Sequence, residues 1–478
     1  MSLQRGEGFF EAVFGFKEVD YFSTRHQLFQ KYTFESNRRS TSTGMPRVFK
    51  ERALFEHPAF GRRHLISGGW HSTPSVAELR AETAELVCAF EEKRPGLLAS
   101  FQKTPPLLQG ETEVLQACAS STVPTSTAGS SIAPWVQCSH TVGESGALHL
   151  RFPNAFFQVA SQFNSLEFVS PDVTPEDGVT HYVYDRTQGP ACALACMAGT
   201  AYRNYLFHPA LFNTDVAQEA EVGEQQRGQQ ALHQLNLLDD LTTYLTQGYS
   251  ASAASALPTV DFDHFYRVRS GYFHPAPSIG SLNGWLERVA TSQGTTPADV
   301  KEALLSRLRV ALVEGATVTL PLHDSHKDGA SLSALHEVSQ VYSSALSLPP
   351  PPAKGSDDAW AGVELLSRII LDGTYEATLL AGVQHTLRSL EQQSKDAPAM
   401  RAGRSESTIA WTLPPIFLTK VGGGVFNNDG TWIASAITSA VTSVGALGVP
   451  LDVRLVHHRA VEPYYAQCFP SWPMRKST

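Results

Sequence analysis

The sequence predicts an α/β protein with a mixed central sheet flanked by helices, and three observations lead to this prediction. Residues 415–458 have the pattern of a strand, a glycine loop, a helix and a second strand, which is typical of α/β units. Upstream, the apolar strand AFFQVAS (155–161) precedes a small-residue segment at 189–195 that opens a buried helix. Hydrophobic residues make up 42% of the chain and charged residues 17%, which favours a sizeable core over disorder.

Composition and periodicity divide the 478 residues into four parts. Residues 1–110 are expected to form an N-terminal extension of short mixed elements. Residues 111–215 and 301–478 are the two parts of the α/β unit. Residues 216–300 are Gln-rich at first and then lack a clear period, so we interpret them as an insertion that forms a lid or a partner surface.

Several further elements follow from the spacing of apolar residues and from turn residues. The segment SVAELRAETAELVCAFEEK (75–93) is amphipathic, and we expect Thr73 to cap this helix with Pro74 in the first helical position. The other predicted elements are helices at 301–313 and 361–380 and strands at 148–152, 316–322 and 338–346.

A run of three glycines, Gly422, Gly423 and Gly424, directly follows the strand PIFLTKV (415–421). Glycines allow the backbone to adopt positive φ and to approach a ligand closely. Backbone amides in such a loop, with the N-terminus of the following helix, form a phosphate cradle. The alternative is that the glycines only form a tight structural turn.

A second candidate loop follows the strand at 155–161. Gln162 and Asn164 lie at the end of this strand, where their side chains could hold ribose hydroxyls. The segment that begins at Gly189 then opens a helix. The alternative is that Gln162 and Asn164 are turn residues that satisfy their own backbone.

Taken in order, these segments resemble the macrodomain family, which binds ADP-ribose and its derivatives. VASQFN (159–164) is similar to the family's VNAAN-like strand end, and GPACALA (189–195) stands where a glycine-rich loop and helix follow. VSQVYSSALSLP (338–349) is similar to a VIHAVGP-type strand, and ILDGTYEATLLAG (370–382) to the next helix. GGGVFNND (422–429) resembles the second phosphate loop.

The resemblance covers roughly residues 145–205 and 310–460, and it implies a three-layer macrodomain-like fold that binds an ADP-ribose-type nucleotide. The phosphates would lie on the amides of the two glycine loops, Asn164 would hold the distal ribose, and Phe426 would cover the ribose. The ligand-binding residues implied in this way are Gln162, Asn164, Gly189, Ala191, Cys192, Gly422, Gly423, Gly424, Val425, Phe426 and Asn427.

Catalysis is less directly implied. Macrodomain hydrolases of the commonest type carry an acidic residue in the first glycine loop, where this chain has Cys192, and the double glutamate of poly(ADP-ribose) glycohydrolases is not visible. If the chain is an ADP-ribosyl hydrolase, Asp185 is our candidate for activating water, and Arg186 for contacting phosphate. Alternatives are a loop ion pair between these two, a Cys192 thiolate nucleophile, and a non-catalytic reader or scaffold.

The charge balance limits the possible partners. A net charge of -9 provides no basic excess for duplex nucleic acid, so we expect an ADP-ribose-type small molecule or an ADP-ribosylated protein. The segment HDSHKD (323–328) lacks a third ligand, so we predict no metal and no cofactor. No apolar run is long enough for a membrane span, no signal peptide is visible, and six dispersed cysteines fit a reduced, cytoplasmic protein.

Overall fold

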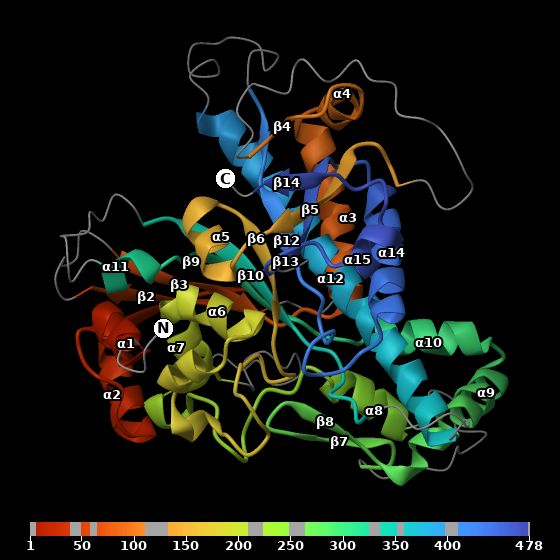
Figure 1. Ribbon diagram of the computed structural model, residues 1–478, viewed down its shortest axis with the longest axis horizontal. Coiled ribbons are helices and arrows are strands. Elements are labelled where there is room, and N and C mark those ends of the chain that lie inside the picture. Colours follow the sequence, from red (N-terminus) through yellow and green to blue (C-terminus); the bar gives the residue numbers. More distant parts are fainter. Residues whose placement is uncertain are drawn as a thin grey trace.

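A computed structural model describes residues 6–38, 49–57, 65–109, 132–208, 223–247, 263–324, 335–350, 358–396 and 410–476. These residues form an α/β structure in which a large mixed sheet is flanked by helices, as the sequence predicts (Figure 1). The boundary expected near residue 110 lies outside these ranges, as do residues 325–328 of the HDSHKD segment.

Within the described ranges, ten strands form one sheet in the order β1-β2-β3-β9-β10-β6-β12-β13-β5-β14. The half from β10 to β14 is parallel throughout, whereas β1, β2, β3, β9 and β10 pair in antiparallel fashion. The strands are β1 (Tyr32–Arg38), β2 (Phe49–Glu56), β3 (Leu65–Ser72), β5 (Val136–Val142), β6 (Phe156–Ala160), β9 (Ala311–Thr317), β10 (Glu337–Ser343), β12 (Pro415–Leu418), β13 (Leu451–His457) and β14 (Met474–Lys476).

Helices cover both faces of this sheet (Figure 1). One layer contains α3 (Val76–Lys93), α12 (Asp358–Asp396) and α14 (Gly430–Gly445), and the other contains α5 (Ser145–Arg151), α6 (Gln188–Ala195) and α7 (Met197–Ala201). Successive side chains of β6 point to opposite faces of the sheet, so both faces need a layer of helices to bury them. Phe156 packs against His385 of α12, whereas the next residue, Phe157, stacks on His149 of α5 with ring centroids 3.7 Å apart.

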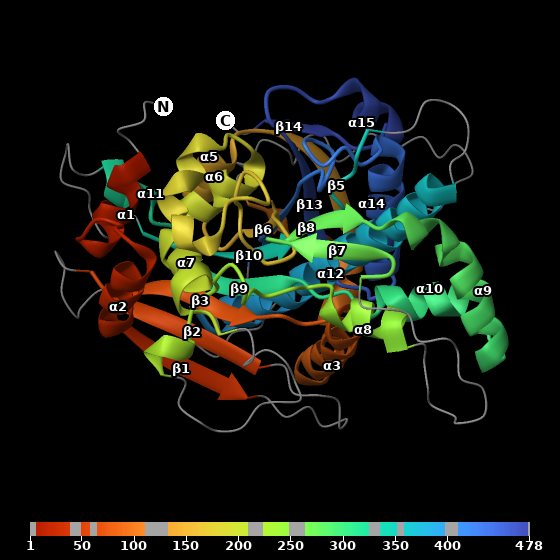
Figure 2. The same cartoon turned by 90° about the horizontal axis from the view of Figure 1, so that it is seen from below.

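The remaining elements lie around these three layers. The helices α1 and α2 adjoin the strands β1 to β3, so the N-terminal region continues the same sheet (Figure 1). From α8 onward, the elements of the 216–300 region group together with α10 on one side of the molecule (Figure 2), whereas the turn Glu224–Gln226 lies against α2. The bounds are α1 (Gly6–Phe14), α2 (Tyr21–Lys31), α4 (Leu97–Lys103), β4 (Leu107–Leu108), α8 (Asp239–Gln247), β7 (Tyr266–Arg269), β8 (Tyr272–Pro275), α9 (Leu282–Gln293), α10 (Pro297–Leu305), α11 (Leu320–Asp324), β11 (Thr412–Leu413) and α15 (Pro463–Cys468).

Several predicted elements differ from the structure. The segment 148–152 lies largely in helix α5 instead of a strand, because its buried side chains face the sheet at helical spacing. The helix predicted at 301–313 ends at Leu305. The strand predicted at 316–322 shares only Ala316 and Thr317 with β9, which begins at Ala311, and its last three residues lie in helix α11.

The cap of helix α3 is also not the predicted one. Ser75, not Thr73, caps the helix: its hydroxyl accepts a hydrogen bond from the Glu78 amide at 3.2 Å, and the Glu78 carboxylate accepts one from the Ser75 amide at 2.7 Å. This capping box satisfies two backbone donors at once, which Thr73 could not do from its position before Pro74.

Candidate functional site

Both candidate loops emerge at the same edge of the sheet. β6 and β12 are adjacent parallel strands, with Phe156 opposite Ile416 and Phe157 opposite Phe417. The segment after β6 contains Gln162, and the segment after β12 contains the glycine run. In parallel α/β sheets, ligands bind at the carboxyl ends of strands, so this edge is the candidate site.

The glycine loop has a defined backbone geometry. Of the three glycines, only Gly422 has a positive φ, at 77°, and Asn427 adopts a φ of 57°. The loop is closed by hydrogen bonds from the Asn427 amide to the Gly424 carbonyl at 3.0 Å and from the Asn428 amide to the Gly422 carbonyl at 2.9 Å. The freedom of glycine to adopt positive φ is therefore used only at Gly422 of the three.

This geometry leaves a set of backbone donors available. Among the described residues, none accepts a hydrogen bond from the amides of Gly422, Gly424, Val425 or Phe426. The loop is open to solvent at this point, since Val425 is 81% exposed. Successive unpaired amides of this kind bind anions well, so the loop has the donors that a phosphate needs.

The side chains of Gln162 and Asn164 hold their own loop together. The Gln162 amide nitrogen donates to the Phe168 carbonyl, and its oxygen accepts from the Phe168 amide, both at 3.0 Å. The Asn164 oxygen accepts from the Leu166 amide at 3.0 Å, and its nitrogen donates to Gln234 at 2.7 Å. The turn role is thus visible for both residues, and a contact to ribose stays a prediction.

Gly189, Ala191 and Cys192 lie in helix α6, which packs directly on the end of β6. A Cβ on Gly189 would stand 2.0 Å from the Ala160 carbonyl oxygen, so only glycine permits this approach. Burial raises the pKa of Cys192 to about 12 and also raises that of Cys196. Both thiols stay protonated at neutral pH, so their burial favours a packing role in α6 over a nucleophilic role for Cys192.

Asp185 is half-buried just before helix α6. Its carboxylate accepts a hydrogen bond from the Thr187 amide at 2.8 Å, which fixes the turn into the helix. Burial is the main cause of the raised pKa of Glu167 and of Tyr272, and the nearby Asp185 carboxylate raises both further by repulsion. Arg186 is exposed. The structure therefore brings Asp185 near two ionisable residues that the sequence analysis does not single out.

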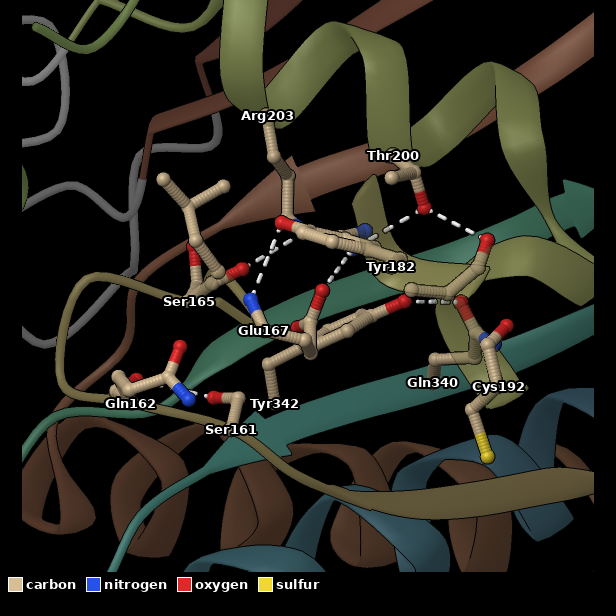
Figure 3. Close-up of polar contacts among 12 residues, drawn as sticks. Ser161, Gln162, Ser165, Glu167, Tyr182, Cys192, Thr200, Arg203, Gln340 and Tyr342 are labelled. Atoms are coloured by element: carbon tan, nitrogen blue, oxygen red, sulfur yellow. Dashed lines mark hydrogen bonds and ion pairs between the residues drawn. The ribbon is translucent and has the colours of Figure 1, made fainter. Parts of the chain in front are cut away.

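Glu167 belongs to a buried polar cluster around Arg203 (Figure 3). The Arg203 guanidinium donates from Nε to the Ser165 carbonyl at 3.0 Å and from Nη2 to the Thr200 hydroxyl at 3.2 Å. The Arg203 Nη2 is 3.5 Å from the Glu167 Oε2, and the central guanidinium carbon, Cζ, lies 3.6 Å from the centre of the Tyr342 ring. Arg203 stands on a π-helical turn (Tyr202–Leu206), a form of helix that is frequent at functional sites.

Burial raises the pKa of Glu167 to about 8, although the nearby Arg203 lowers it in part. The carboxyl group is therefore mostly protonated at neutral pH. The Glu167 amide donates to the Tyr182 hydroxyl at 3.0 Å. Within the described part of the chain, Oε1 of Glu167 and Nη1 of Arg203 are buried and have no hydrogen-bond partner. A single Glu and a single Arg carry no sequence motif, so only the structure identifies this pair.

The hairpin β7–β8 of the insertion contacts both loops. The Tyr272 hydroxyl donates to the Phe168 carbonyl at 2.6 Å, and the Phe163 amide donates to the Gly271 carbonyl at 3.0 Å. The Tyr272 ring also contacts Phe426 of the glycine loop, with centroids 5.5 Å apart. The aromatic side chain expected over the ribose, Phe426, therefore has a second aromatic neighbour, Tyr272.

The fold and the site together define an α/β protein with a loop cluster at the carboxyl edge of a parallel half-sheet. Comparison of the chain with sequence models of protein families, with curated proteins and with solved structures gives no match. Among the described residues, no three His, Cys, Asp or Glu side chains are grouped as metal ligands, and no helix is long and apolar enough to cross a membrane.

Proposed function

We propose that this chain binds an ADP-ribose-type nucleotide, free or attached to a protein, at the carboxyl edge of β6 and β12. The observation that supports this most is the set of unpaired amides at Gly422, Gly424, Val425 and Phe426. They follow a buried parallel strand, and they resemble the second phosphate loop of macrodomains both in sequence and in chain order.

The neighbourhood of this loop is consistent with the same ligand. The loop that contains Gln162 follows β6, which is the strand adjacent to β12. A nucleotide with two phosphates could therefore reach both this loop and the glycine loop. Phe426 and Tyr272 supply an aromatic surface beside the glycine loop, on which a ribose or a base would pack. The macrodomain-like arrangement is part of this proposal.

Hydrolysis would use Asp185 to orient water. Glu167, mostly protonated at neutral pH, is the nearby acid, but it is fully buried and would act only if the cluster opened. Two observations favour the second candidate, a reader without turnover. Asp185 is already engaged by the Thr187 amide, and the family's acidic loop position holds the buried thiol of Cys192.

Calorimetric titration with ADP-ribose tests the proposal, with AMP and NAD as comparison ligands. The informative variant is Gly424→Val, because a Cβ added to Gly424 meets no atom within 4 Å and the fold should be preserved. We expect saturable binding by the wild type and at least ~10-fold weaker binding by the variant, since a branched side chain would obstruct the amides. Equal affinity in both proteins would show that the phosphates do not lie on this loop.

A further inference from the structure

A cluster of ionisable side chains lies next to the glycine loop, toward the carboxyl ends of β12, β13 and β5. Lys420 follows β12, His457 ends β13, and His140 lies on β5. The Lys420 ammonium group donates to the Glu462 carboxylate and lies 3.5 Å from Nδ1 of His457. Nothing in the function proposed above uses this cluster.

The hydrogen-bond directions show that His457, which is itself bonded to His140, contacts Lys420 without neutralising it. Nδ1 of His457 accepts from the Glu462 amide at 3.3 Å as well as from Lys420, so its proton is on Nε2. That proton is donated to Nδ1 of His140 at 3.0 Å. Burial, with the charge of Lys420, lowers the pKa of His457 to about 3 and lowers that of His140, so both rings are uncharged at neutral pH.

The charge of Lys420 is thus balanced by Glu462, with which it forms its ion pair. The Glu462 side chain is 50% exposed, whereas that of Lys420 is 17% exposed. A second carboxylate, that of Asp429, lies near the neighbouring Tyr465 but accepts hydrogen bonds from Thr431. An exposed carboxylate can move into solvent at little cost, and this would leave a fixed cation.

Lys420 also begins the glycine loop itself. Its carbonyl accepts the Gly423 amide at 3.0 Å, and a Cβ on Gly423 would lie 3.4 Å from the Lys420 Cβ. The cation and the unpaired amides of the loop therefore belong to one short segment of the chain. We propose that Lys420 is the cation of an anion-binding subsite beside the glycine loop, and that a ligand phosphate displaces Glu462 from it. This assignment rests on the proposed function and names the side chain that neutralises the phosphate.

The test compares calorimetric affinities for ADP-ribose and for inorganic pyrophosphate. We expect Lys420→Met to weaken both by ~10-fold or more, because a charge-assisted hydrogen bond to phosphate is lost. Lys420→Arg should retain most of the affinity, and Glu462→Gln should strengthen binding because it removes the competing carboxylate. Lys93→Met is the matched control, since Lys93 is also paired with a glutamate, Glu391, but lies on α3.

Each outcome separates this inference from the function proposed above. If Gly424→Val loses ADP-ribose but Lys420→Met binds it like the wild type, the subsite is wrong and the nucleotide proposal stands. If the wild type binds no ADP-ribose, the nucleotide proposal fails. In that case, pyrophosphate binding that is lost in Lys420→Met supports the subsite, and no pyrophosphate binding by the wild type overturns it.

Discussion

Substitutions at Gly422 and Gly424 should have very different consequences for stability, although the two residues are close in sequence. Gly422 has a φ of 77°, and a Cβ there would lie 2.5 Å from the Ala345 Cβ and 2.6 Å from the Asn428 side-chain nitrogen. That nitrogen donates to the Leu346 carbonyl at 2.7 Å and to the Phe426 carbonyl at 3.2 Å. Gly424 has an unstrained backbone and open space around it.

The geometry gives the size of the effect. A non-glycine residue in the left-handed region costs ~1–2 kcal/mol, and each hydrogen bond lost by Asn428 costs ~1 kcal/mol. Gly422→Ala should therefore lower the free energy of unfolding by about 3 kcal/mol, whereas Gly424→Ala should change it by less than about 0.5 kcal/mol. Gly294→Ala is a useful control, because its φ of 65° is strained but a Cβ there meets no atom within 4 Å, so about 1 kcal/mol is expected.

Urea unfolding followed by fluorescence measures these differences as shifts in the midpoint at constant slope. A loss at Gly424 as large as that at Gly422 would refute the loop geometry. If Gly422→Ala is no worse than the Gly294 control, the contacts with Asn428 and Ala345 do not contribute as described.

Three other predictions concern ionisable residues. Burial raises the pKa of Glu167 from 4.5 to about 8, so the proton bound to its carboxyl group stabilises the fold fully below pH 4.5, and this stabilisation is lost as the pH rises through about 8. In Glu167→Gln, the urea midpoint of unfolding should therefore decline less over this pH range. An unchanged pH profile would contradict the assignment. Iodoacetamide at about pH 8 should modify exposed Cys88 and Cys468 but not Cys192 in the native protein, as read by mass spectrometry, and fast labelling of Cys192 would contradict its burial. If an ADP-ribosylated peptide is turned over, Asp185→Asn should lower kcat by ~100-fold or more with binding retained, and a wild-type rate would exclude this carboxylate from the reaction.

The parallel half of the sheet could be predicted because each of its central strands is a short apolar run next to a loop signal. The strands at 155–161, 338–346 and 415–421 were expected, and they correspond to β6, β10 and β12. The sequence predicts a mixed sheet, but it does not predict strands β1, β2 and β3 of the antiparallel half individually. Strand β3, LISGGWHS, contains two glycines, and its pairing with β9 joins residues more than 200 positions apart. Such pairing depends on the assembled sheet and has no local pattern.

The candidate site likewise contains residues that lie in a local sequence motif and residues that come together only in the folded chain. The glycine loop is a local motif, so sequence alone could locate its donors. Glu167 and Arg203 meet only after the chain has folded around α6, and neither lies in a motif. Tyr272 belongs to a segment without clear period, so its contact with Phe426 follows from tertiary structure alone.

The charge of the whole chain determines where recognition of an anionic ligand must come from. A net charge of -9 does not attract a diphosphate over long distances, so local donors have to supply the affinity. The two ends of the carboxyl edge of the sheet differ in the groups that they offer to an anion. The end at β12 offers unpaired amides and Lys420, whereas the end near α6 offers Asp185 and the mostly neutral Glu167. If the proposed function is right, the phosphates should therefore bind mainly at the β12 end, which leaves the acidic residues for the part of the ligand that carries no charge.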